Sequence, residues 1–146
     1  MSVSVWEEKT KRDIDQATEK IVKLIAAKRY TFNVDNENPE RQKNQDFLDK
    51  YQKSIEIRNL ILSSLQPESC GDVRKKDEND DLMYVYFVEQ GLYPKGCSLR
   101  TKKKKVSIYI KVEICKNAVN SDYGLVISFH EKEFDRSHYY DQLPEY

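Results

Sequence analysis

A strict alternation of apolar and polar residues between Val106 and Ile114 constrains the fold of this chain more than any other feature. Alternation with a period of two places successive side chains on opposite faces of a β-strand. The apolar set is Ile108, Ile110, Val112 and Ile114, and the other set is Ser107, Tyr109, Lys111 and Glu113. We expect the first set to lie in the core and the second set to form a polar face.

Two more segments are typical of strands. Leu82–Val88 is rich in aromatic and β-branched residues, and Gly124–His130 alternates again. In the second of these segments Leu125, Ile127 and Phe129 are apolar, and they alternate with Val126, Ser128 and His130. The connection before it, Asn117–Tyr123, suits a turn, whereas residues 89–105 predict a long loop. If the last two strands pair, the polar surface contains Tyr109, Lys111, Ser128 and His130.

The first half of the chain has a helical period instead. Apolar residues from Ile14 to Ile25 recur at spacings of three and four, which predicts a helix with one apolar face. Tyr30–Val34 predicts a short strand, and Pro39 is well placed to begin the first of two short helices that end by Leu65. The polar segment from residue 66 to residue 81 predicts a surface loop.

This order of elements predicts an α+β fold in one domain, residues 1–146, with N-terminal helices followed by an antiparallel sheet. The helical half spans residues 1–66, the sheet residues 82–132 and an acidic tail residues 133–146. No apolar stretch approaches the roughly 18 residues needed to cross a bilayer, and no secretory signal is visible. Three widely spaced cysteines and two histidines argue against a zinc site. We therefore expect a cytoplasmic protein that needs no metal or other cofactor.

Charge is balanced over the whole chain but not locally. The window from Lys95 to Lys111 holds seven basic residues and no acidic one, whereas Glu131–Tyr146 has a net charge of −3. The basic residues before the strand are Arg100, Lys102, Lys103, Lys104 and Lys105. Such a segment can bind a phosphate backbone by electrostatic attraction. The alternative is a solvated hairpin whose lysines protect a sheet edge from pairing.

The predicted polar face brings together a hydroxyl, an ammonium and an imidazole, from Tyr109, Lys111 and His130. Cleavage of RNA through its own 2′-hydroxyl needs a base, an acid and a cation at the phosphorus. Histidine can move protons near neutral pH. The structural alternative is that His130 lies at a strand end with its ring hydrogen-bonded to a carbonyl group.

Several short motifs occur in an order that resembles the MqsR-type toxins of bacterial toxin–antitoxin systems. They are Arg41-Gln-Lys-Asn44 with Phe47-Leu48, Ile61-Leu-Ser-Ser-Leu65, Tyr109-Ile-Lys-Val-Glu-Ile114 and Val126-Ile-Ser-Phe-His-Glu-Lys132. The resemblance covers residues 41–132. It implies a RelE-like fold and a metal-independent endoribonuclease, an mRNA interferase, that is restrained by a cognate antitoxin protein. It also implies that Tyr109 and His130 are functional.

The chain departs from the family pattern at two positions. A lysine that follows the helix in some members is missing, so Arg74 or Lys75 would replace it in RNA binding, and a glutamine is missing near Val85. A non-catalytic protein of a phage or mobile element that binds nucleic acid or a nuclease as an inhibitor is therefore a second hypothesis. In a third, the polar face of the sheet contacts a partner subunit.

Overall fold

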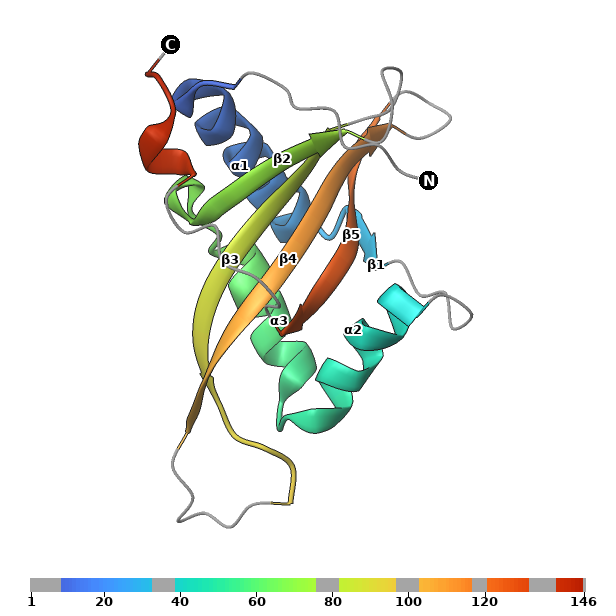
Figure 1. Cartoon of the computed structure of the whole chain (residues 1–146). Coiled ribbons are helices and arrows are strands. Elements are labelled where there is room, and N and C mark those ends of the chain that lie inside the picture. Colours follow the sequence, from blue (N-terminus) through green and yellow to red (C-terminus); the bar gives the residue numbers. More distant parts are fainter. Residues whose placement is uncertain are drawn as a thin grey trace.

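The computed structural model describes residues 9–32, 39–75, 82–96, 103–116, 121–131 and 139–145 (Figure 1). The elements in chain order are α1 (Lys11–Ala26), β1 (Tyr30–Phe32), α2 (Pro39–Lys50), α3 (Ser54–Ser63), the 3-10 helix η1 (Pro67–Ser69), β2 (Cys70–Lys75), β3 (Leu82–Leu92), β4 (Lys104–Lys116), β5 (Asp122–Glu131) and the 3-10 helix η2 (Tyr140–Gln142). The predicted α+β class, with the helices mostly preceding the strands, is confirmed.

The five strands form one sheet in the order β1-β5-β4-β3-β2. Strands β2 to β5 pair antiparallel, as was predicted for β3, β4 and β5, but β1 runs parallel to β5. The expectation of a purely antiparallel sheet is therefore wrong, and the sheet is mixed. The chain enters β1 beside the start of β5, where the amide of Gly124 donates to the carbonyl of Arg29 at 2.9 Å. Residues 30–34 do not encode this direction, because a short strand has the same pattern in either orientation.

The segment predicted as a polar surface loop contains a strand. Residues 70–75 form β2 at the edge of the sheet, with Cys70 1% and Val73 2% exposed. The register shifts between Cys70 and Asp72. The two buried apolar residues, Cys70 and Val73, are therefore three positions apart instead of two, and the segment lacks the alternation expected of a strand. An edge strand with two buried apolar side chains and polar neighbours resembles a loop when only its composition is considered.

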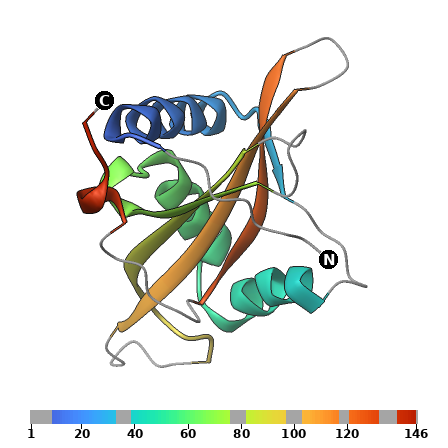
Figure 2. The ribbon, with the colours of Figure 1, turned by 45° about the horizontal axis from the view of Figure 1, so that its top comes forward.

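Helices α1 and α3 cover one face of the sheet (Figure 2). Helix α1 begins with a capping box in which Thr10 and Asp13 satisfy each other's backbone amide groups. On this face Ile108, Ile110 and Val112 of β4 are fully buried, as their alternation predicted. The hydroxyl groups of Thr18 on α1 and Tyr86 on β3 are hydrogen-bonded at 2.7 Å, which fixes how the helix sits on the sheet.

A bulge in β5 changes the predicted faces of that strand. Lys111 pairs with Ser128 but Val112 pairs with Val126, so Ile127 is an extra residue. As a result Val126 joins Phe129 in the core, whereas Leu125 pairs with Glu113 on the opposite face. The prediction that Leu125, Ile127 and Phe129 share a face is wrong, because alternation does not continue through a bulge.

Beyond Val126 the outer edge of β5 lies against α2 rather than β1. The side-chain amide of Asn44 donates to the carbonyl of Ile127 at 3.0 Å and accepts from the amide of Phe129 at 2.8 Å. These two bonds reproduce those of a parallel strand opposite Ser128. Asn44 therefore continues the edge that β1 begins.

The C-terminal residues 139–145 pack near the start of α1. Tyr140 donates its hydroxyl to Asp15 at 2.8 Å, and the amide of Lys11 donates to the carbonyl of Pro144 at 2.7 Å. None of the helices within the described ranges has the length and apolar character to cross a membrane.

Candidate functional site

The polar face predicted from alternation forms where β4 pairs with β5. Tyr109 lies directly opposite His130, and Lys111 lies opposite Ser128. The Tyr109 and His130 rings are stacked, with centroids 5.3 Å apart and an interplanar angle of 24°. On the other side of Tyr109, Phe87 of β3 makes an edge-to-face contact at 5.7 Å. The register thus brings together the three side chains predicted to be catalytic: Tyr109, Lys111 and His130.

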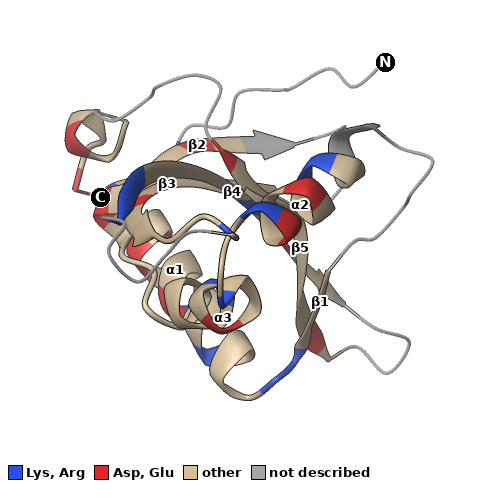
Figure 3. Ribbon diagram, turned by 90° about the horizontal axis from the view of Figure 1, so that it is seen from below, with Lys and Arg blue, Asp and Glu red and all other residues tan. Residues whose placement is uncertain are grey.

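Tyr109 and His130 alternate along their strands with core residues such as Ile110 and Phe129, so their rings lie on the face of the sheet opposite to α1 and α3. Figure 3 views the sheet from below, with α1 and α3 together on one side of it. The N-terminal helix therefore does not pack over these rings. The site is nevertheless closed, because Tyr109 is 7% and His130 6% exposed, and Ser128 beside them is 3% exposed. Lys111 is partly buried. The stacked pair is thus held in place and shielded from bulk water.

The ring of His130 has a defined hydrogen bond. Its Nδ1 lies 2.9 Å from the main-chain carbonyl oxygen of Glu131. A carbonyl oxygen can only accept, so Nδ1 carries the hydrogen and Nε2 is the basic nitrogen of the neutral ring. This contact is the one expected under the structural alternative for His130. It is also the contact that a histidine acting as a base through Nε2 would make.

The side chain of Glu131 is held by the end of α2. Tyr51 donates a short hydrogen bond to Glu131 Oε1, and Lys50 Nζ lies 2.9 Å from the same oxygen. Tyr51 is fully buried and packs its ring against Phe47, with centroids 5.1 Å apart. Burial raises the pKa of Tyr51, and the hydrogen bond to Glu131 raises it further. The same hydrogen bond, followed by the contact with Lys50, lowers the pKa of Glu131.

The basic residues of the β3–β4 connection lie at the same end of the sheet as His130. Lys103, Lys104 and Lys105 are exposed at the start of β4. Lys105 forms an ion pair with Glu89 at 3.0 Å, whereas Lys103 lies over the ring of Tyr93, 5.6 Å from its centroid. An exposed tyrosine among lysines is a surface on which an unpaired base can stack.

This connection is attached to the turn between α2 and α3. The amide of Gln52 donates to the carbonyl of Tyr93 at 2.8 Å, and the amide of Lys95 donates to that of Lys50 at 2.9 Å. The exposed residues Lys50 and Lys53 therefore lie at the same end of the molecule as Lys103–Lys105. Their spacing in the chain did not predict this grouping. We call Lys50, Lys53, Lys95, Lys103 and Lys104 the basic end.

Lys105, also predicted to bind RNA, pairs with Glu89 next to this group. Four other basic residues were predicted to bind RNA: Arg74, Lys75, Arg100 and Lys102. Arg100 and Lys102 lie outside the described residues. Arg74 and Lys75 pair with Met83 and Leu82, at the far end of β3 from the start of β4. At about 3.3 Å per residue, the length of β3 puts them roughly 30 Å from the basic end. Arg74 and Lys75 therefore do not join the same binding surface.

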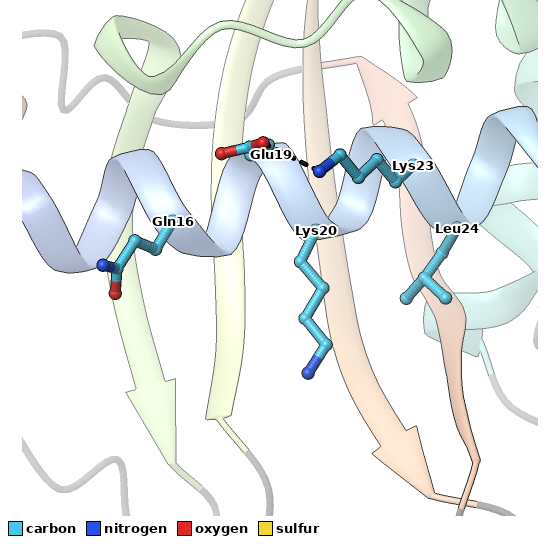
Figure 4. Close-up of a pocket in the computed structure, with 5 residues that line it drawn as sticks. All are labelled: Gln16, Glu19, Lys20, Lys23 and Leu24. Carbon is cyan, nitrogen blue, oxygen red and sulfur yellow. Dashed lines mark ion pairs between the residues drawn. The ribbon is translucent and has the colours of Figure 1, made fainter.

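Neither a metal-ligand cluster nor the surface hollow of the described residues suggests a second site. Within the described part of the chain, no three His, Cys, Asp or Glu side chains are grouped as metal ligands. A hollow of about 350 Å³ lies along α1 and is lined by side chains of that helix (Figure 4). Its charged groups are already paired, because Lys23 contacts Glu19 at 2.9 Å and Lys20 contacts Asp122.

Comparison of the chain with known protein families, with curated proteins and with solved structures found no match.

Proposed function

We propose that this protein is a metal-independent endoribonuclease that cleaves single-stranded RNA, acting as an mRNA interferase toxin in the cytoplasm under the control of a cognate antitoxin protein. The observation that carries the proposal is the stacked pair of Tyr109 and His130, with Lys111 two residues along β4 on the same face of the sheet. A hydroxyl, an imidazole and an ammonium on one face supply the acid, the base and the cation that RNA cleavage without a metal ion needs.

In the proposed reaction the RNA supplies its own nucleophile. His130 Nε2 takes the proton of a 2′-hydroxyl, and the 2′-oxygen forms a bond to the neighbouring phosphorus. The bond from phosphorus to the 5′-oxygen breaks, and that oxygen receives a proton from Tyr109. Lys111 stabilises the negative charge that develops on the phosphoryl oxygens. The products are a 2′,3′-cyclic phosphate and a 5′-hydroxyl end.

The basic end is proposed to hold the RNA strand. Lys103 and Lys104 are exposed, and Lys104 is close enough to Glu131 to lower its pKa. The phosphate backbone of an RNA strand bound at the basic end would therefore run toward the end of β5 that carries His130. Because Tyr109 and His130 are 7% and 6% exposed, the proposal requires this face to open when RNA binds.

The second candidate is a non-catalytic protein that binds RNA or a nuclease through the basic end. The burial of both rings and the contact of His130 with the Glu131 carbonyl favour it, because a purely structural pair would have the same geometry. Under this hypothesis the stacked rings stabilise the sheet and take no part in any reaction.

Cleavage of a labelled single-stranded RNA by the purified protein in EDTA separates the two functions. We expect the wild type to release 2′,3′-cyclic phosphate ends, and His130→Ala and Tyr109→Phe to leave the RNA intact. Tyr86→Phe is the matched control, because it removes a buried hydroxyl on the helix-covered face. If the RNA stayed intact with every protein, the proposed nuclease activity would be rejected. If His130→Ala and Tyr109→Phe both cleaved the RNA, the roles assigned to these two residues would be rejected.

A further inference from the structure

The second half of β5 is positioned by α2, and this dependence extends to the ring of His130. Among the described residues, two contacts orient the ring. Tyr109 stacks on one face, and the Glu131 carbonyl accepts from Nδ1. The stacking contact sets the plane of the ring but not which nitrogen carries the hydrogen. That choice depends on where the carbonyl of Glu131 lies.

Glu131 is the last residue of β5, and the residues that follow it, 132–138, lie outside the described part of the chain. Within the described residues its position is fixed from two sides. Its backbone pairs with Ile108 of β4, and its carboxylate accepts from Tyr51 and Lys50 at the end of α2. Of these two side chains, Tyr51 is the rigid one, because it is fully buried against Phe47. Lys50 is exposed and has a long flexible chain.

We propose that Tyr51, acting through Glu131, is a positioning residue that keeps His130 in the tautomer with hydrogen on Nδ1. In that tautomer Nε2 is the nitrogen able to accept a proton, which is the role that the proposed RNA cleavage gives it. The inference rests on that proposed function for its catalytic consequence. The tautomer itself can be measured without any substrate.

If Tyr51 served for packing alone, burial of its hydroxyl group would cost free energy of folding without any benefit. A phenylalanine would fill the same space against Phe47 without burying a polar group, and Glu131 would keep Lys50 as its partner. The hydroxyl adds a hydrogen bond to a charged acceptor, and such bonds are stronger and more directional than neutral ones. Its effect is therefore to hold the residue whose carbonyl orients His130.

The test is the ¹⁵N spectrum of histidine-labelled protein in alkaline buffer, where imidazole rings are neutral. The chain has two histidines, and a His138→Gln background leaves His130 as the only signal. We expect the wild type to show hydrogen on Nδ1. Tyr51→Phe should shift His130 to a mixture with the Nε2–H tautomer and lower kcat for RNA cleavage about tenfold, the effect of losing one hydrogen bond.

Two further variants make the result decisive. Tyr86→Phe removes an equally buried hydroxyl that contacts Thr18, so it should keep the wild-type tautomer and a kcat within about twofold. Glu131→Ala should reproduce the tautomer mixture, and with its side chain 43% exposed it tests the same contact if Tyr51→Phe does not fold. Hydrogen retained on Nδ1 in a folded Tyr51→Phe or Glu131→Ala protein would overturn the inference. Absence of cleavage by the wild type would instead reject the proposed function. The tautomer measured in Tyr51→Phe would still show whether Tyr51 positions His130.

Discussion

Removal of the Asn44 side chain tests how α2 stabilises β5. The side-chain amide of Asn44 bonds both the carbonyl of Ile127 and the amide of Phe129 at the outer edge of β5, and these residues are 5% and 1% exposed. In Asn44→Ala the carbonyl of Ile127 and the amide of Phe129 each lose their hydrogen bond to this side chain. At roughly 1–1.5 kcal/mol each, the free energy of unfolding should fall by about 2–3 kcal/mol.

This loss corresponds to a decrease in Tm of about 6–9 °C for a domain of this size, at about 3 °C per kcal/mol. Alanine is a better helix former than asparagine by about 0.5 kcal/mol, so the measured loss is a lower limit for the two bonds. Urea unfolding followed by circular dichroism, together with thermal melting, gives both quantities.

Gln45→Ala is the matched control on the next position of α2. Its side chain is exposed, and among the described residues its amide donates to Asp49 on the same helix, at 2.9 Å. We expect a change of less than about 0.5 kcal/mol. If Asn44→Ala were as stable as Gln45→Ala, the interpretation of Asn44 as a substitute for a strand would be wrong.

Three other perturbations have defined outcomes. Thr10→Ala breaks the capping box with Asp13 and should lower the free energy of unfolding by about 1 kcal/mol in urea titrations, and an unchanged midpoint would contradict the cap. The pKa of Glu131 is held below its ordinary value, so its contribution to stability is present at neutral pH and is lost as the pH falls through about 4.5 and below. The Tm of the wild type should therefore drop more steeply in acid than that of Glu131→Gln, and parallel curves would disprove this. Replacing Lys103 and Lys104 by alanine should reduce the slope of log Kd for single-stranded RNA against log salt by about 1.4, whereas an unchanged slope would remove both lysines from the interface.

Local spacing was sufficient to predict elements whose pattern extends over many residues. Helix α1 and the two faces of β4 agree with their sequence periods, because each period repeats often enough to identify one buried face. The pairing of Tyr109 with His130 was also predictable, since both residues fall on the polar side of strands that a short connection joins. Their predicted position on one face of the sheet is confirmed, but both side chains are buried, and their roles in a reaction stay predictions.

The sequence by itself therefore determined the class of fold, the core face of β4 and the Tyr109–His130 pair. Only the tertiary structure decided the parallel direction of β1, the presence of β2, the bulge at Ile127 and the contact of Tyr51 with Glu131. The reason is physical. Periodicity records which side of an element is buried, but not which distant segment lies against it or in what register. Tyr51 and Glu131 are 80 residues apart in the chain, so their contact exists only once α2 has packed along the edge of β5.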